Sequence, residues 1–349
     1  MQKVKLAVVG AGLIGRRHIE RILSSSSCTL VAVADPSQAA KVLAAELNVA
    51  YTESLTDLLA KNIAEGVILA TPNQLHVEQG LACLAAGVTT LIEKPVASSL
   101  EEGMRLASAA AADAPILVGH HRAHSPLMTQ AQQLIQRGQL GELVAVTGAA
   151  LFYKPDSYFA AAPWRTQAGG GPILINLIHE IHNLRMLCGE IIQVQAFASQ
   201  LRRGFPVEDT VAINLRFASG ALGTFLLSDT AASAKSWEQT SQEDKSYPAY
   251  NDEDCYHISG TKGSLGVPTM RLKRYAAERS WRQPFEVSRL APERADPLAR
   301  QLEHFCALVR GETEPLVTLF DGLQNLRVSE AISKAAVTGH SVSVPTDWF

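Results

Sequence analysis

The first third of the chain alternates short apolar runs with stretches of helical periodicity. Continuous apolar runs, typical of parallel strands buried on both faces, cover residues 4–9, 29–34, 66–70, 88–92 and 116–119. Helical periodicity begins near residue 13 and recurs over 38–47, 55–60, 75–86 and 100–112. This alternation predicts an α/β fold with a doubly wound, right-handed parallel sheet.

The pattern changes after residue 120. We predict helices over 126–137 and 169–188, and strands over 140–153, 194–201, 211–217, 221–228 and 255–260. Short connections between strands imply a largely antiparallel sheet. Two helices, over 297–309 and 321–337, finish the chain. We therefore expect a first domain over 1–122 and an α+β domain over 123–349, in which the polar segment 231–254 is a functional loop or an oligomer arm.

The amino-acid composition and net charge limit the classes of protein to which the chain can belong. A chain of 349 residues suits two domains, and 47% hydrophobic with 19% charged residues is ordinary for a globular protein. The net charge of −3 gives no reason to expect nucleic acid or an anionic membrane as partner, and no apolar run is long enough to span a bilayer. Five scattered cysteines and an N-terminus that enters a strand directly indicate free thiols and a cytoplasmic protein.

A glycine motif joins the first strand to the first helix. Gly10 permits a tight turn, Gly12 lets backbone amides approach a pyrophosphate, and Gly15 lets the helix pack closely on the strand. The helix then starts at Leu13-Ile14 and points its positive end at the phosphates.

Asp35 ends the second strand, twenty residues after Gly15. A carboxylate there can accept hydrogen bonds from both ribose hydroxyls and would repel a 2′-phosphate, so NAD is favoured over NADP. The alternative is that the glycines merely end a buried strand. Of Arg16, Arg17 and His18, which follow the motif, at least two are expected to be a solvated helical turn.

Three further turns are expected beside the dinucleotide, because ligands bind beyond the carboxyl ends of parallel strands. They are Thr71-Pro72-Asn73, Glu93-Lys94-Pro95 and the run from His120 to His124. At least one histidine of this last run is expected to border the nicotinamide. His76 opens the helix after the first of these turns, where it is either a helix-start residue or part of the site. Lys94 could hydrogen-bond a substrate hydroxyl and stabilise alkoxide character, or it could be a surface lysine.

A polar stripe interrupts the apolar helix over 169–188. Asn176, His179, His182 and Asn183 recur at spacings of three and four, and such a stripe costs free energy unless it faces partners or a cavity. We interpret it as lining the active site. The run from His179 to His182 lacks the HExxH spacing and no cysteine pair accompanies it, so no metal site is expected.

At these positions the chain resembles the glucose-fructose oxidoreductase, inositol dehydrogenase and rhizopine-catabolism (Gfo/Idh/MocA) oxidoreductases. The resemblance rests on the stretches 10–18, 70–76, 93–95, 164–165, 169–179 and 260–263, with Asp35, in family order over nearly the whole chain. It implies a Rossmann domain, a second domain with an open-faced sheet, and hydride transfer with a nicotinamide cofactor.

The resemblance also implies site residues. The matching lysine, here Lys94, contacts the substrate hydroxyl, and its bond to Pro95 is often cis. His179 matches the catalytic histidine. Combining the resemblance with the turns and the polar stripe described above, we expect cofactor contacts from Gly10, Gly12, Leu13, Ile14, Gly15, Asp35, Thr71, Pro72, Asn73, His76, Glu93, Lys94 and His121. The expected substrate contacts are Lys94, Tyr153, Trp164, Arg165, Asn176, His179 and His182. Arg165 could instead form a salt bridge at the domain seam, and Lys154 and Tyr158 could join Tyr153 at the cleft.

Two positions depart from the pattern. Inositol dehydrogenase-like members carry an aspartate four residues before the histidine and another three residues after it, where this chain has Ile175 and His182. Asn176 can replace them only as a hydrogen-bonding group. Reduced activity, an altered substrate or a different proton path therefore stay open.

The expected function is an NAD-dependent dehydrogenase acting on a secondary alcohol of a sugar, cyclitol or related polyol. Alternatives are a glycosidase that keeps NAD bound and uses transient oxidation, and a non-catalytic NAD-binding regulatory protein. An open sheet face usually needs covering, so a homodimer or homotetramer through the C-terminal sheet is expected. The substrate, its reacting carbon and the direction of the reaction are not encoded in any of these patterns.

Overall fold

The computed structural model describes residues 2–111, 114–291 and 293–348, and the chain forms two compact units. The first takes the described residues up to His124 together with Pro297–Leu326, and the second takes Ser125–Asp296 and the described residues from Arg327 onward. The expected division into 1–122 and 123–349 differs from this result, because the chain returns to the first unit. Helix α10 (Pro297–Val309) buries Leu302, Phe305 and Cys306 there and contacts α1.

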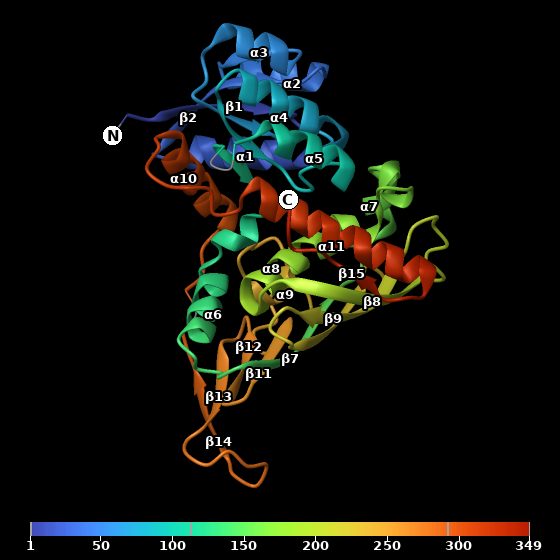
Figure 1. The fold of residues 1–349 in the computed structure, drawn as a ribbon. Helices are drawn as coiled ribbons and strands as arrows, with labels where there is room; N and C mark the ends of the chain where they lie inside the picture. The colour runs from blue at the N-terminus through green and yellow to red at the C-terminus, as the bar shows by residue number, and fades with distance from the viewer. Residues whose placement is uncertain (1, 112–113, 292, 349) are drawn as a thin grey trace. The chain divides into compact units, whose positions relative to one another are not determined.

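The first unit is built on a six-stranded parallel sheet in the order β3-β2-β1-β4-β5-β6 (Figure 1). The strands are β1 (Val4–Val9), β2 (Cys28–Ala34), β3 (Ala50–Thr52), β4 (Gly66–Leu69), β5 (Thr89–Ile92) and β6 (Ile116–Val118). The predicted doubly wound sheet is confirmed. Strand β3 was not expected, because its three residues at the sheet edge carry no apolar run; they pair with β2 from Ala32 to Ala34.

Helices separate these strands, as the periodicity indicates. They are α1 (Leu13–Ser24), α2 (Gln38–Glu46), α3 (Leu55–Lys61), α4 (His76–Ala85) and α5 (Leu100–Ala109), with 3₁₀ turns η1 (Asn73–Leu75) and η2 (His121–His124). Ser37, Ser54 and Ser99 cap α2, α3 and α5 through their side chains. The predicted end of the α5 helix at residue 112 lies outside the described residues.

The second unit holds a nine-stranded sheet in the order β14-β13-β12-β11-β7-β10-β9-β8-β15. The strands are β7 (Leu143–Leu151), β8 (Ile191–Ser199), β9 (Thr210–Phe217), β10 (Leu222–Ser228), β11 (Tyr256–Gly260), β12 (Gly263–Val267), β13 (Arg271–Tyr275), β14 (Phe285–Arg289) and β15 (Val342–Ser343). Of the described pairs, β7 with β10 is parallel and the others are antiparallel, which confirms the largely antiparallel prediction.

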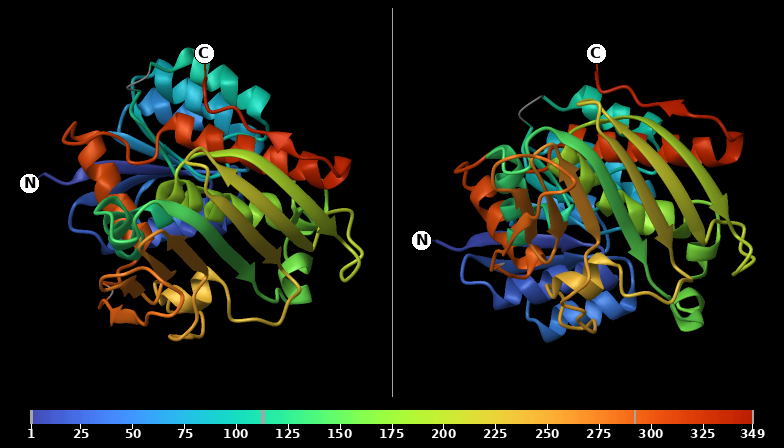
Figure 2. Two further views of the ribbon diagram at one scale, coloured as in Figure 1. Left: turned by 60° about the horizontal axis from the view of Figure 1, so that its bottom comes forward. Right: turned by 90° about the horizontal axis from the view of Figure 1, so that it is seen from below.

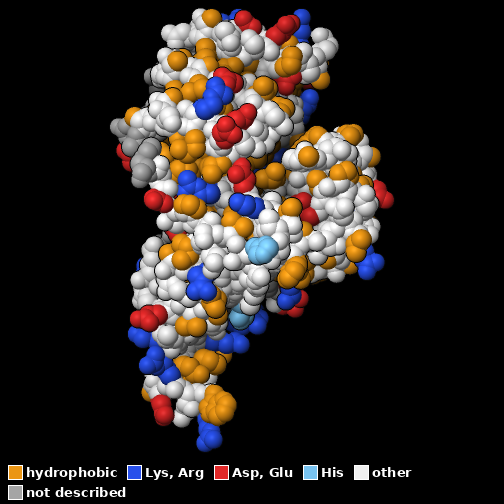
Figure 3. Space-filling model, turned by 45° about the vertical axis from the view of Figure 1, so that its right-hand side comes forward, with side chains coloured by type: hydrophobic (Ala, Val, Ile, Leu, Met, Phe, Trp, Pro, Cys, Tyr) orange, Lys and Arg blue, Asp and Glu red, His pale blue; other side chains and the backbone are white. Residues whose placement is uncertain are grey.

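Strands β12 to β15 were not expected. β14 is exposed along its whole length and β13 carries Arg271, Lys273 and Arg274, so neither shows a buried, apolar alternation. In Figure 3 the lower end of the molecule, where Figure 1 draws β14, carries several lysine and arginine side chains.

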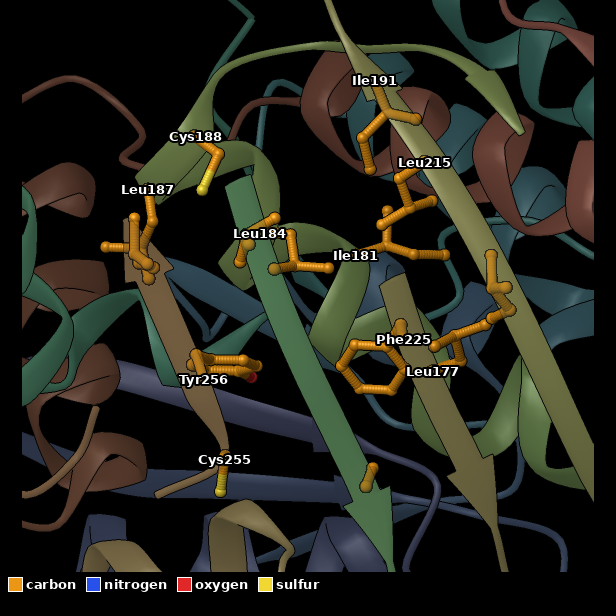
Figure 4. Close-up of a cluster of buried hydrophobic side chains, with 14 of the residues drawn as sticks. Leu177, Ile181, Leu184, Leu187, Cys188, Ile191, Leu215, Phe225, Cys255 and Tyr256 are labelled. Carbon is orange, nitrogen blue, oxygen red and sulfur yellow. The ribbon is translucent and has the colours of Figure 1, made fainter. Parts of the chain in front are cut away.

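The helices of the second unit are α6 (Pro126–Gln136), α7 (Asp156–Ala160), α8 (Ile178–Cys188) and α9 (Trp237–Ser241), with a 3₁₀ turn η3 (Pro163–Thr166) and a π-turn η4 (Ile173–Leu177). α11 (Leu319–Thr338) begins in the first unit and ends in the second. The core lies between the sheet and the segment formed by η4 and α8: Leu177 lies beside Phe225, and Ile181 lies beside Leu215 (Figure 4).

The other face of this sheet is open. Along β9 and β10 buried and exposed residues alternate, and Phe197, Leu222 and Leu226 are exposed. Figure 2 shows β7 to β10 with no described helix over this face. The open-faced sheet that the resemblance implies is therefore present.

The described residues include no helix with both the length and the apolar content needed to cross a bilayer. All five cysteines are buried free thiols, as expected.

Candidate functional site

The glycine turn after β1 has the geometry expected of a dinucleotide loop. Gly10 has a φ of +90°, and a Cβ added there would lie 2.6 Å from the Ala70 carbonyl oxygen. A Cβ on Gly15 would lie 1.9 Å from the Gly10 oxygen, so only glycine allows α1 to pack this closely. A Cβ on Gly12 would meet nothing within 4 Å, which leaves open space beside the loop.

The start of α1 offers unsatisfied amides to a phosphate. Its N-cap residue Gly12 makes no side-chain capping bond, and the first turn contains no acidic residue. Leu13 and Ile14, the first helical residues, are exposed and partly exposed respectively.

Asp35 at the end of β2 is held as a carboxylate. Its Oδ2 accepts from the Ala11 amide at 2.8 Å and its Oδ1 from the Ser37 amide at 2.8 Å. Burial would raise the pKa of Asp35, but the bonds from Ser37 and Ala11 and the charge of Arg16 outweigh it and hold the pKa below its ordinary value. The carboxylate is partly exposed, so it can still accept hydrogen bonds from a ribose.

The turn after β4 is braced by His76. Thr71 and Asn73 are partly exposed and Pro72 is exposed, whereas His76 is buried. Its Nε2 lies 2.9 Å from the Thr71 carbonyl oxygen and its Nδ1 lies 2.8 Å from the Pro95 carbonyl oxygen. Burial lowers the pKa of His76, against the opposing influence of both carbonyls and Glu93. His76 is the first residue of α4, as the helix-start prediction has it, and its ring in addition connects the two turns.

The turn after β5 places Lys94 at the same sheet edge. Lys94 is partly exposed and its bond to Pro95 is cis, as the resemblance implies. The Glu93 carboxylate points inward, where it meets His18 Nε2 at 2.8 Å, so it is not among the exposed groups of the turn. Of the run at the end of β6, His120 and His124 are buried and His121 is partly exposed.

The polar stripe of the second unit divides between two environments. His179 and His182 on α8 are nearly buried, and Ile175 and Asn176 just before α8 are partly exposed. Asn183, which was expected to line the active site with them, instead donates to Tyr256 Oη at 2.9 Å within the unit. This difference arises because Asn183 faces the flank of the sheet that carries Tyr256. The π-turn η4, a feature frequent at functional sites, directly precedes α8.

The side chain of Asn176 accepts a hydrogen bond from a lysine. Lys154 Nζ donates to Asn176 Oδ1 at 2.6 Å and lies 4.7 Å from the centre of the Tyr158 ring. Lys154 Nζ also lies 4.0 Å from Asp229, which binds Arg203 Nε at 2.8 Å. Because an ammonium group has no acceptor, the oxygen of the Asn176 amide must face Lys154 and its NH₂ group must face away.

Arg165 stacks on the same tyrosine. Its guanidinium carbon lies 3.8 Å from the centre of the Tyr158 ring, and Nη1 donates to the Tyr158 carbonyl at 2.5 Å. Among the described residues of the second unit no carboxylate forms an ion pair with Arg165, and a salt bridge at the domain seam stays a prediction. Trp164 is largely exposed, and Tyr153 lines a cavity of about 650 Å³ with Phe159 and Arg203.

Two groups of residues are thus brought together, each inside one unit. The first combines the glycine turn, Asp35, the Thr71 turn and the Lys94 turn at the carboxyl edge of the parallel sheet. The second combines Asn176, Arg165 and Lys154 beside the π-turn that leads to His179.

Sequence patterns missed some supporting residues. His18 lies on the buried face of α1 with Gly15, Ile19 and Ile22, at spacings of three and four, whereas Arg16 and Arg17 are exposed as expected. A polar residue at a buried-face position was the available signal. The Arg203–Asp229 pair joins two loops and has no comparable local signal.

The residues of the first unit fit a dinucleotide. The open space beside Gly12, the uncapped start of α1 and the ionised Asp35 provide for a pyrophosphate and a ribose. No group of three potential metal-ligating side chains is found within the part of the chain that the structure describes.

Comparison with known proteins agrees with both units. Residues 4–120 match the family described as "Oxidoreductase family, NAD-binding Rossmann fold", and residues 128–266 match the "GFO/IDH/MocA C-terminal domain". The 1,5-anhydro-D-fructose reductase of Ensifer adhaerens is 26% identical over 97% of this chain and 98% of its own length. The scyllo-inositol 2-dehydrogenase (NAD(+)) of Bacillus subtilis is 26% identical over 98% and 96%.

A solved structure shows the same architecture. The WlbA dehydrogenase from Bordetella pertussis, crystallised with NADH and UDP-GlcNAcA, superposes with a TM-score of 0.78 at 26% identity, covering 99% of this chain and 100% of that one. The match to this dehydrogenase therefore extends over both units of the chain. The chain belongs to the Gfo/Idh/MocA family of NAD-dependent oxidoreductases.

Proposed function

We propose that this protein is a dehydrogenase that oxidises a secondary alcohol of a sugar, cyclitol or related polyol with NAD. The observation that carries the proposal is the position of Lys94, a partly exposed lysine at the carboxyl edge of the parallel sheet, where this fold binds its dinucleotide. Full-length similarity to a reductase of an anhydro sugar and a dehydrogenase of an inositol supports the substrate class.

The residues of the first unit bind the cofactor. When bound, NAD supplies the hydride acceptor. Gly10, Gly12, Gly15 and the start of α1 hold its pyrophosphate, and Asp35 accepts hydrogen bonds from the ribose hydroxyls. Thr71, Pro72, Asn73 and His121 border the cofactor.

Two residues handle the hydroxyl proton. The Lys94 ammonium group donates a hydrogen bond to the substrate oxygen and stabilises the negative charge that develops there as the hydride leaves. His179 accepts the hydroxyl proton through its imidazole, a group suited to proton transfer near neutral pH. Tyr153, Trp164, Arg165, Asn176 and His182 bind the remaining substrate hydroxyls.

The absence of carboxylates at Ile175 and His182 changes how the substrate is held. Asn176 presents amide N–H donors, because Lys154 occupies its oxygen. Substrate oxygens next to Asn176 therefore act as acceptors, whereas an aspartate at this face would have required them to be donors.

We further propose a homodimer or homotetramer formed through the open face of the second unit's sheet. Phe197, Leu222 and Leu226 are exposed on strands of that face, which favours its burial against a second copy. Location in the cytoplasm stays a prediction.

The test is a panel of polyols, sugars and hydroxy acids with NAD and with NADP, followed by the absorbance of the reduced nicotinamide. We expect NADH formation with at least one polyol or sugar. Lys94→Ala should reduce kcat by about 10² to 10⁴, the usual contribution of a positioned proton-transfer group, while NAD binding persists. His179→Ala should do the same.

The outcomes separate the alternatives. Glycoside cleavage without net NADH would indicate the NAD-bound glycosidase. NAD binding without turnover on the whole panel would indicate a regulatory protein. Full turnover by Lys94→Ala would disprove the proposed role of Lys94.

A further inference from the structure

The Lys94 turn is supported from inside the first unit by buried polar side chains. Three side chains form this support: His18 on α1, Glu93 at the end of β5 and His76 at the start of α4. His18 and His76 are each 1% exposed, and Glu93 is 4% exposed.

Glu93 connects His18 to Lys94. Its Oε1 lies 2.8 Å from His18 Nε2, and its Oε2 accepts from the Lys94 backbone amide at 3.1 Å. Both carboxylate oxygens are therefore used, one on the glycine-turn helix and one on the turn that carries the lysine. Glycine at position 119, just after β6, leaves room for this carboxylate, because a Cβ there would lie 2.9 Å from the Glu93 carboxyl carbon.

The charges around Glu93 favour its ionised form. Burial would raise the pKa of Glu93, but the hydrogen bond and charge of His18, with the charges of His121 and Lys94, hold the pKa below its ordinary value. A buried carboxylate with this set of partners is costly to disturb, because removing one partner leaves an uncompensated charge.

His76 supports the other side of the turn. Its ring lies between the carbonyl oxygens of Thr71 and Pro95, at 2.9 and 2.8 Å from its two nitrogens. The ring therefore spans the turn after β4 and the turn after β5. A substitution that removes the ring takes away both contacts at once.

We propose that His18, Glu93 and His76 are positioning residues that set the Lys94 side chain relative to the glycine turn and the Thr71 turn. Their role is to fix geometry, and they exchange no proton with the substrate. This inference rests on the proposed function, since it presumes that Lys94 acts on the substrate.

The expected effect follows from how strictly proton-transfer geometry is set. A displacement of a reacting group by about 1 Å can cost on the order of 100-fold in rate. Loss of the His18–Glu93 contact or of the His76 ring should therefore lower kcat far more than it changes the affinity for NAD. The reason is that Gly10, Gly12 and Asp35 remain in place.

The test compares variants of the full chain loaded with NAD. His18→Leu removes the donor to Glu93, and His18→Gln keeps a donor at similar reach. Glu93→Gln keeps the shape without the charge. The matched control is His304→Gln, a histidine of α10 in the same unit whose ring packs against His124 and accepts from the Leu316 amide.

We expect kcat to fall about 10- to 100-fold in His18→Leu, Glu93→Gln and His76→Leu, with the NAD dissociation constant within about threefold of the parent. His18→Gln should recover most of the loss seen in His18→Leu. His304→Gln should retain the parent kcat. A purely structural role would lower the folded fraction and leave kcat per folded molecule unchanged, so kcat is normalised to NAD-binding sites.

The inference and the proposed function fail differently. One outcome is that the parent protein oxidises a substrate, Lys94→Ala does not, and His18→Leu and Glu93→Gln retain the parent kcat. That outcome would disprove the positioning role and leave the proposed dehydrogenase function intact. If His18→Gln is as impaired as His18→Leu, a hydrogen-bonding role for His18 is disproved. If the parent turns over nothing in the panel, the proposed function itself fails.

Discussion

Removing one hydroxyl group, with Tyr256→Phe, should destabilise the second unit strongly. Tyr256 is 1% exposed, and its Oη donates to Glu180 Oε2 and accepts from Asn183 Nδ2 at 2.9 Å. Glu180 is 1% exposed and Asn183 is fully buried. Without the hydroxyl, a buried amide donor and a buried carboxylate each lose a partner.

The magnitude can be worked from these contacts. An unsatisfied buried amide costs about 1–3 kcal/mol and a lost hydrogen bond to a charged group about 1.5–3 kcal/mol. Allowing for relaxation, we expect the free energy of unfolding of this unit to fall by about 3 kcal/mol. In a unit of this size each kcal/mol shifts Tm by about 2–4 °C, so Tm should fall by about 10 °C.

Hydrogen exchange over α8, combined with denaturant unfolding, measures this loss in the unit concerned. Tyr250→Phe, at a tyrosine that is 42% exposed, is the control and should change stability by less than about 0.5 kcal/mol. Glu180→Gln should cost less in the Tyr256→Phe background than alone, because the hydrogen bond from Tyr256 to the Glu180 carboxylate is then already lost. A change below about 0.5 kcal/mol in Tyr256→Phe, with no coupling to Glu180, would refute the reasoning.

Three further predictions follow from other parts of the structure. Asp35→Asn keeps an acceptor for the Ala11 amide but removes the charge that repels a 2′-phosphate. The preference for NAD over NADP, measured as the ratio of kcat/KM values, should therefore fall by about tenfold or more. An unchanged ratio would contradict the assignment of Asp35 to the ribose. Acidification should destabilise the first unit, because the folded-state pKa values of His76 and Glu93 both lie below their ordinary values of 6.5 and 4.5. The unfolded state then binds more protons, so stability is lost as pH falls below about 6.5 for His76 and below about 4.5 for Glu93; increased amide protection of this unit at pH 5 would be the opposite result. Leu222→Glu, on the open sheet face, should lower the mass measured by light scattering without lowering Tm, and an unchanged mass would argue against assembly through this face.

Local patterns were sufficient for every strand of the first unit's parallel sheet except β3. Strand β1, the glycine turn and Asp35 lie within one short stretch, and each depends on a backbone or burial requirement that a single residue type reveals. The same holds for Lys94, because a residue directly after a buried parallel strand must lie at the ligand-binding edge.

Contacts between distant residues escaped sequence reasoning. His18 meets Glu93 across 75 positions and Tyr256 meets Glu180 across 76. The return of α10 to the first unit depends on side chains such as Phe305 finding the sheet built by the beginning of the chain.

The sequence by itself determined most of the alternating elements of the parallel sheet, the dinucleotide turn and the place of Lys94 directly after a buried strand. These follow from periodicity and from glycine at places where a Cβ would collide. Tertiary structure alone decided which polar groups are buried together: His18 with Glu93, Lys154 with Asn176, and Tyr256 with Glu180 and Asn183. The physical reason is that a buried polar side chain must find a partner in space, and neither periodicity nor spacing along the chain records where that partner will be.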